Sequence, residues 1–306
     1  MEVSIIKAIQ SVANDFWDIV MMIFSFLGTT GFFTVMFVLL FWCYDKRFAF
    51  RFAAIFGASS VINWGLKEVF MRPRPFMADS GIINYTNTVG YSMPSGHSTA
   101  IASVAGTLIY EVQKTRKKWF KITAIISLVL LCLCVGLSRM YLGQHYLSDV
   151  LAGLALGFTV SLIMCKFIKF GDKEHIYALF LLPFLVLGYL MFIDTLATDN
   201  FRTGEYPIIF MLGIGIILGY FFEKRFVKYS SAKILWFEIV KVIVFGGVAL
   251  GLYFLLNAVL PNLVFFRSLI MLVDILFVMV LCPWLFKIIE GMIIKRRNDF
   301  CLRARP

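Results

Sequence analysis

The sequence predicts an all-α polytopic membrane protein, and composition, charge and the length of its apolar segments support this prediction. Hydrophobic residues make up 60% of the 306 residues, charged residues make up 15%, and the mean hydropathy is +0.86. A soluble domain keeps about a quarter of its residues charged. The apolar residues form runs of roughly 17–25, the length that a helix needs to cross about 30 Å of hydrocarbon. Because lipid offers no partners to backbone polar groups, we expect these runs to be helices.

The first 26 residues differ from the segments that follow. Residues 1–26 combine charged positions with an apolar stripe at helical spacing, so they are predicted to form an amphipathic helix in the membrane interface. We interpret the rest of the chain as about nine spans, at 28–44, 48–70, 97–113, 120–137, 147–168, 176–194, 206–222, 235–257 and 264–289.

The net charge of +11 would suggest a nucleic-acid-binding protein if the chain were soluble. Here Lys and Arg cluster in short loops between apolar segments, which is typical of cytoplasmic loops, so we expect no nucleic-acid partner. The basic loops follow the first, third, fifth, seventh and ninth spans, and they include Lys46, Lys117, Lys173, Lys224 and Arg296. The acidic loop that contains Asp194, Asp199 and Glu205 is predicted on the opposite side. The six cysteines show no metal or disulfide spacing.

Three short motifs lie on the predicted non-cytoplasmic side. They are Lys67 with Arg74-Pro75, then Pro94-Ser95-Gly96-His97, and then Ser138-Arg139 with His145 and Asp149. Each has an ordinary alternative: a Lys-Arg pair can anchor a span at the interface, Pro-Ser-Gly forms turns, and a His–Asp pair can be structural. Their combination at one membrane face favours a common site.

The residue types in these motifs suit phosphate chemistry. Lys67, Arg74 and Arg139 supply positive charge, while the Ser95 hydroxyl and the Gly96 amide at a helix start can hold phosphate oxygens. Two of the three histidines of the chain, His97 and His145, fall in the motifs. Asp149 follows His145 by four residues, so one helical turn can bring its carboxylate to the imidazole and fix the tautomer. The third histidine, His175, is expected in a solvated loop.

These motifs resemble the signature of the type 2 phosphatidic acid phosphatase superfamily, which includes lipid phosphate phosphatases, glucose-6-phosphatase and vanadium haloperoxidases. The signature reads Lys-x6-Arg-Pro, Pro-Ser-Gly-His and Ser-Arg-x5-His-x3-Asp, and this chain meets every defined position between about residues 50 and 165. The turn at 44–47 and the run Leu151-Ala152-Gly153 also resemble bacterial relatives of sphingoid-phosphate phosphatases.

The resemblance implies a site in which each motif residue has a role. His145 attacks phosphorus, Asp149 orients His145, and His97 acts as acid and then as base. The phosphate-binding residues are Lys67, Arg74, Ser95, Gly96 and Arg139, with no metal and no other cofactor. A six-helix phosphatase core is implied within residues 27–194, and residues 195–306 are predicted to form additional transmembrane helices and a basic cytoplasmic tail.

The resemblance implies a cell-membrane phosphatase that hydrolyses a lipid phosphate, monoester or diphosphate, at the extracytoplasmic face through a phosphohistidine. Two alternatives stay open, a phosphatase for a small sugar phosphate of the glucose-6-phosphatase type and a phosphotransferase or transporter on the same scaffold. The lipid also stays open: undecaprenyl diphosphate, phosphatidylglycerol phosphate, phosphatidate or a sphingoid phosphate. We expect the loop at 76–93 to cover the site.

Membrane lipids are the other expected partners, and a homodimer is possible through glycine pairs spaced four residues apart. These pairs are Gly153 with Gly157, Gly215 with Gly219, and Gly247 with Gly251, and close packing within the chain is the alternative. Asp274, inside the ninth predicted span, is a further functional candidate without an assigned role.

Overall fold

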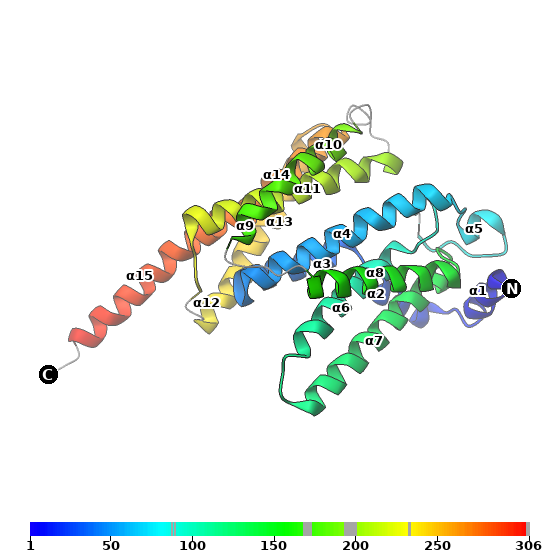
Figure 1. Cartoon of the computed structure of the whole chain (residues 1–306), viewed down its shortest axis with the longest axis horizontal. Coiled ribbons are helices and arrows are strands. Elements are labelled where there is room, and N and C mark those ends of the chain that lie inside the picture. Colours follow the sequence, from blue (N-terminus) through cyan, green and yellow to red (C-terminus); the bar gives the residue numbers. More distant parts are fainter. Residues whose placement is uncertain (87, 89, 168–172, 193–200, 232–233, 304–306) are drawn as a thin grey trace. The chain divides into compact units, whose positions relative to one another are not determined.

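The structure is a computed structural model of the chain, and it describes residues 1–86, 88, 90–167, 173–192, 201–231 and 234–303 (Figure 1). Every regular element within these ranges is helical. The contacts divide the chain into two compact units, the first made of Met1–Phe37 and Arg51–Lys169 and the second of Val38–Phe50 and Phe170–Pro306. The predicted division into 27–194 and 195–306 differs from these units and stays a prediction.

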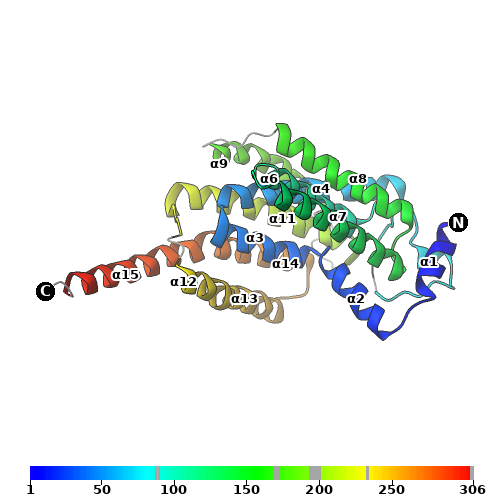
Figure 2. The same ribbon diagram turned by 90° about the horizontal axis from the view of Figure 1, so that it is seen from below.

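The first unit contains the helices that carry the three motifs. Its helices are α1 (Glu2–Gln10), α2 (Asp15–Phe26), α3 (Thr30–Leu39), most of α4 (Lys46–Phe70), α5 (Pro75–Ala78), α6 (Gly96–Val112), α7 (Lys118–Tyr141) and α8 (Leu147–Phe167). Helices α6, α7 and α8 lie side by side, with α1 and α2 against α7 (Figure 2).

The second unit consists of helices that follow the motifs, together with Val38–Phe50, which runs from the end of α3 to the first residues of α4. They are α9 (Glu174–Tyr177), α10 (Leu182–Leu190), α11 (Phe201–Phe222), α12 (Leu235–Val240), α13 (Gly246–Val259), α14 (Val264–Leu276) and α15 (Cys282–Arg303). Short π-helical turns join α12 to α13 and α14 to α15.

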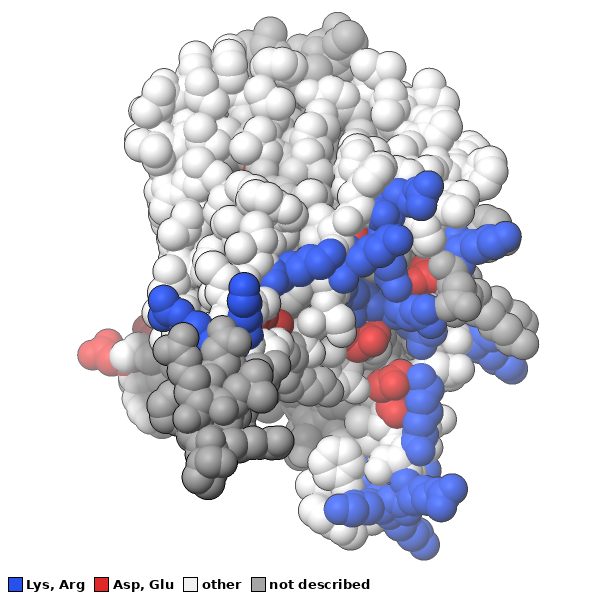
Figure 3. Space-filling view, turned by 90° about the vertical axis from the view of Figure 1, so that its left-hand side faces the viewer, with Lys and Arg blue, Asp and Glu red and all other residues white. Residues whose placement is uncertain are grey.

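The chain is a membrane protein with several spans. Within the described residues, five helical segments are long and apolar enough to cross a membrane, at Lys118–Tyr141, Leu147–Lys166, Pro207–Val227, Leu235–Val259 and Val264–Arg296. A sixth is added if α2 and residues 30–44, which meet at 55°, count as one bent span. Helices also stand at the other expected spans, but α6 has only 17 residues, and the count of nine is not confirmed. Lys and Arg side chains gather beside a broad uncharged surface (Figure 3).

The N-terminal segment forms two helices, so the prediction of one amphipathic helix over residues 1–26 was wrong. The chain leaves the helix at 11–14, and Asn14 caps α2 by accepting a hydrogen bond from the Trp17 amide at 3.0 Å. An Asn side chain that bonds to the backbone in this way favours a helix start over a helix interior. Ile6 of α1 is fully buried against Ile82, Met140, Tyr146 and Val150, so α1 packs onto the first unit.

Helices α6 and α8 pack closely because glycines of α8 face the backbone of α6. A Cβ added at Gly153 would lie 2.5 Å from the Ser95 carbonyl oxygen, and one at Gly157 would lie 2.3 Å from that of Thr99. In the second unit, Gly215 and Gly219 face side chains instead, because an added Cβ would lie 2.2 Å from Ile275 Cγ2 and 2.9 Å from Met279 Cβ, respectively. Close packing within the chain is therefore confirmed for these two pairs.

The third glycine pair lies in a different environment. No described atom lies within 4 Å of a Cβ added at Gly247 or Gly251 of α13. The homodimer stays a prediction.

Asp274 of α14 has a buried Oδ1 without a hydrogen-bond partner among the described residues.

Candidate functional site

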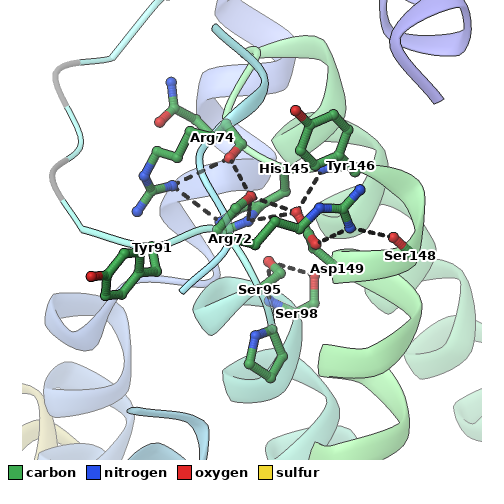
Figure 4. A network of polar contacts seen from close by, with 12 residues as sticks. Arg72, Arg74, Tyr91, Ser95, Ser98, His145, Tyr146, Ser148 and Asp149 are labelled. Atoms are coloured by element: carbon green, nitrogen blue, oxygen red, sulfur yellow. Dashed lines mark hydrogen bonds and ion pairs between the residues drawn. The ribbon is translucent and has the colours of Figure 1, made fainter. Parts of the chain in front are cut away.

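The three motifs meet in the first unit, at the end of α4, the start of α6 and the turn between α7 and α8 (Figure 4). The Ser95 amide donates a hydrogen bond of 2.9 Å to the Asp149 carbonyl oxygen, which joins the start of α6 to the first turn of α8. Gly143 has a φ of +74°, a left-handed conformation that suits glycine. The turn that follows it brings His145 back to Arg139, whose carbonyl oxygen lies 3.3 Å from the His145 amide.

His145 and Asp149 are both buried, with 2% and 0% of their surface exposed. The closest ring-to-carboxylate contact joins His145 Nδ1 and Asp149 Oδ2 at 3.7 Å, which is longer than a hydrogen bond. Ser92 lies between them, because its hydroxyl donates to Asp149 Oδ2 and is 3.4 Å from His145 Nδ1. The structure thus brings the predicted pair together, with Ser92 as an intermediary that the sequence analysis did not identify.

The three predicted cations converge on His145 from different segments. Arg74 Nη1 lies 3.5 Å from His145 Nε2 and 3.3 Å from the Gln144 carbonyl oxygen. Lys67 Nζ donates to the Tyr91 carbonyl oxygen at 2.6 Å. Arg139 is 2% exposed, its Nη1 donates to the Ser25 hydroxyl, and its Nε has no hydrogen-bond partner among the described residues.

The electrostatic environment keeps His145 neutral. Burial, followed by the positive charges of Lys67, Arg74 and Arg139, holds the pKa of His145 well below its ordinary value of 6.5. A neutral imidazole has a lone pair that is available for attack on phosphorus. The same positive charges favour an anion next to the ring.

The Pro-Ser-Gly-His motif starts α6 as predicted. Ser95 is the N-cap, and its hydroxyl accepts hydrogen bonds from the amide and the hydroxyl of Ser98, at 3.4 and 3.0 Å. Gly96 is the first residue of the helix. His97 lies within electrostatic range of His145 and Arg139, and a Cβ added at Gly28, between α2 and α3, would lie 2.8 Å from His97 Cβ.

Arg72 is a site residue that the sequence analysis missed. Its guanidinium donates to Asp149 Oδ1 at 2.7 Å, to the Ser148 hydroxyl at 2.6 Å and to Glu2 Oε2 at 2.7 Å (Figure 4 shows the first two contacts). Its position two residues before Arg74 was visible in the sequence, but nothing in the sequence placed Glu2 beside it.

The loop at 76–93 lies against the site. Gly90 and Tyr91 supply the carbonyl oxygens that accept hydrogen bonds from Arg74 and Lys67. Gln10 of α1 fixes the middle of the loop through both the amide and the carbonyl of Ile83, at 3.0 and 2.9 Å. The loop therefore helps to hold the cations in place, and its role as a cover stays a prediction.

No group of three His, Cys, Asp or Glu side chains within the described ranges is arranged to hold a metal ion. Metal-free chemistry stays a prediction that rests on the three cations.

Two family models match the chain. Residues 48–171 match the PAP2 superfamily, and residues 210–292 match the PAP2 superfamily phosphatase, transmembrane extension. All predicted site residues, from Lys67 to Asp149, lie in the first match.

Individual relatives match over shorter stretches. Phosphatidylglycerophosphatase B of Bacillus subtilis is 38% identical over 106 residues, which are 34% of this chain and 49% of the relative. Lipid phosphate phosphatase delta of Arabidopsis thaliana is 28% identical over 163 residues, which are 51% of this chain and 39% of the relative. The chain thus spans less than half the length of these two relatives.

One solved structure is also similar, the crystal structure of a transmembrane PAP2-type phosphatidylglycerolphosphate phosphatase from Bacillus subtilis. It aligns with a TM-score of 0.49 and 27% identity, and the alignment covers 55% of this chain and 86% of the chain in that structure.

Proposed function

Since the chain belongs to the PAP2 superfamily, we propose that it is an integral membrane phosphatase that hydrolyses a lipid phosphate through a phosphohistidine on His145. The observation that carries this proposal is the convergence of Lys67, Arg74 and Arg139 on a buried, neutral histidine. Such a group of cations stabilises the charge that develops on the equatorial phosphate oxygens during phosphoryl transfer. The names of the two relatives, both of which refer to lipid phosphates, support the substrate class.

We assign Nε2 of His145 as the nucleophile. Nδ1 faces Ser92 and Asp149, so it carries the proton, whereas Nε2 faces Arg74. Nε2 forms the bond to phosphorus as the bond to the lipid alkoxide breaks, and His97 donates a proton to that alkoxide. His97 then takes a proton from water, which attacks the phosphohistidine, releases phosphate and restores both imidazoles.

We propose that groups from all three motifs hold the phosphate. Lys67, Arg74 and Arg139 supply charge-assisted hydrogen bonds, and Ser95 with the Gly96 amide supplies neutral donors at the start of α6. The buried Nε of Arg139, without a partner among the described residues, fits this role. No metal ion is assigned to the proposed site.

The test of substrate class is phosphate release by the purified, detergent-solubilised protein. Lipid monoesters, a lipid diphosphate and glucose 6-phosphate are compared at equal concentration. We expect release from at least one lipid phosphate and far slower release from the sugar phosphate. Preference for glucose 6-phosphate would support the alternative of a soluble-substrate phosphatase, and transfer of the phosphoryl group to a second lipid would support a phosphotransferase.

We further propose nine spans, with the site on the extracytoplasmic side of the cell membrane. The basic loops that follow alternate spans support this orientation. Asp194 and Asp199 of the predicted opposite loop lie outside the described residues. A cysteine at the exposed Ser80 should react in intact cells with a membrane-impermeant thiol reagent, whereas a cysteine at Thr115 should react only after lysis. The parent chain with its native cysteines is the control, and the reverse pattern would place the site in the cytoplasm.

A further inference from the structure

The guanidinium of Arg72 connects the N-terminal helix to the carboxylate next to His145. Nη1 donates to Asp149 Oδ1 at 2.7 Å and to the Ser148 hydroxyl at 2.6 Å, and Nη2 donates to Glu2 Oε2 at 2.7 Å. The guanidinium carbon also lies 3.9 Å from the centre of the Tyr146 ring. The group is therefore held on three sides, and its hydrogen bonds are directed at protein groups.

Arg72 matters to Asp149 because that carboxylate is completely buried. The side chain of Asp149 has 0% of its surface exposed, and a buried carboxylate that loses its cation becomes an uncompensated charge. The two oxygens of Asp149 have different partners. Oδ1 accepts from Arg72, whereas Oδ2 accepts from the Tyr146 amide at 2.9 Å and from the Ser92 hydroxyl, and it is the oxygen nearest to His145.

This arrangement fixes the rotation of the carboxylate. If Oδ1 is held by Arg72, Oδ2 faces Ser92 and His145 Nδ1. If Arg72 is lost, the carboxylate can turn or move away, and the tautomer of His145 is then no longer enforced. We propose that Arg72 is a positioning residue, which acts on His145 through Asp149 and is itself anchored by Glu2 of α1. This inference rests on the proposed function of His145.

Glu2 is well placed to anchor Arg72. Its Oε1 accepts a hydrogen bond of 2.8 Å from the Ser148 amide in the first turn of α8, while Oε2 accepts from Arg72. Although burial opposes it, these contacts lower the pKa of Glu2 below its ordinary value. Four residues further on, the buried Ile6 fixes α1 against the first unit. The N-terminal helix lies outside residues 48–171, which match the family, yet it contributes directly to the support of the site.

The test is a kinetic comparison of Arg72 variants with a lipid phosphate substrate. Arg72→Met should lower kcat about 10- to 100-fold, which is the range expected when a catalytic group is misplaced by about 1 Å. The same variant should change KM less than about threefold. Arg72→Lys should recover part of kcat, because an ammonium can reach Asp149 but cannot form the same fork with Glu2. An unchanged kcat, or a raised KM at unchanged kcat, would overturn the inference.

The matched control is Lys7→Met. It removes another ion pair between α1 and the loop, Lys7 with Asp79 at 3.0 Å, in which the lysine side chain is 45% exposed. Removal of such an exposed pair should change stability little. We therefore expect Lys7→Met to keep wild-type kcat, and a loss equal to that of Arg72→Met would assign the effect to the docking of α1 in general.

A double-mutant cycle shows whether Arg72 acts through Asp149. If it does, Arg72→Met should lower kcat in the wild-type background and cause no further loss in an Asp149→Asn background. Additive losses would overturn the inference. If Arg72→Met does not fold, as judged by thermal unfolding, the same cycle is run with Arg72→Lys and read by the same criterion. Failure of the wild-type protein to hydrolyse any phosphate would instead contradict the proposed function, so the two failures are distinguishable.

Discussion

Replacement of Gly153 by alanine should damage the site more than the fold. An added Cβ at this position would lie 2.5 Å from the Ser95 carbonyl oxygen and 3.0 Å from Ser98 Cβ. An ordinary carbon–oxygen contact is about 3.3 Å, so the start of α6 must move away from α8 by about 0.8 Å. That movement separates Ser95, Gly96 and His97, on α6, from His145 and Asp149, at the start of α8.

The expected changes in stability and in kcat/KM of Gly153→Ala follow from two opposing effects on stability and one effect on activity. Alanine gains about 1 kcal/mol over glycine in helix propensity, whereas overpacking costs about 1–3 kcal/mol, so the net loss of stability should be small. A displacement of about 1 Å between catalytic groups can cost about 100-fold in rate, so we expect a loss of about 10- to 100-fold in kcat/KM.

The assay combines phosphate release with thermal unfolding in the same detergent. Gly251→Ala is the matched control, because this glycine has the same four-residue spacing to a partner but no described atom within 4 Å of the added Cβ. It should keep full activity and be as stable as the wild type or more so. A Gly153→Ala variant that is as active as Gly251→Ala would refute the reasoning.

Three further predictions concern the site. Ser25→Ala removes the hydroxyl that accepts a hydrogen bond from Arg139 Nη1. Since hydrogen bonds to charged groups contribute about 1.5–3 kcal/mol, KM in steady-state kinetics should rise about tenfold. An unchanged KM would contradict the role of Ser25. Because the pKa of His145 is lowered, the acid-side decline of kcat/KM should lie below pH 6.5. Lys67→Met, which removes a positive charge, should move this acid-side decline to higher pH, and a shift to lower pH would refute the electrostatic explanation. Hydrolysis should continue in excess EDTA and be inhibited by orthovanadate, whereas loss of activity in EDTA that magnesium restores would argue against metal-free chemistry.

The positions of the motifs could be predicted from the sequence because they depend on local features. The membrane class follows from hydropathy, the start of α6 follows from the Pro-Ser-Gly turn, and the proximity of His145 to Asp149 follows from a spacing of four residues. Each of these inferences needs only residues that are near one another in the chain.

The supporting residues could not be predicted because they come from distant segments. Arg72 contacts Glu2, 70 residues away, and Arg139 contacts Ser25, 114 residues away. No periodicity in a single sequence encodes such pairs. The break at 11–14 was missed for another reason: the apolar stripe over residues 1–26 obscured the capping role of Asn14. The count of nine spans stays a prediction, because apolar character indicates candidate spans without showing how many of them cross the membrane.

The most direct test of the central claim is the identification of the phosphorylated residue. The protein is mixed with a lipid phosphate that carries labelled phosphorus, and the reaction is quenched in alkali, in which phosphohistidine survives. The labelled residue is then identified by mass spectrometry. We expect label on His145 in the wild type, label that decays more slowly once substrate is removed in His97→Ala because the second step is slowed, and none in His145→Ala. The His145→Ala variant should also retain less than about a tenth of the activity. Label on another residue, or an active His145→Ala variant, would contradict the assignment of His145 as the nucleophile.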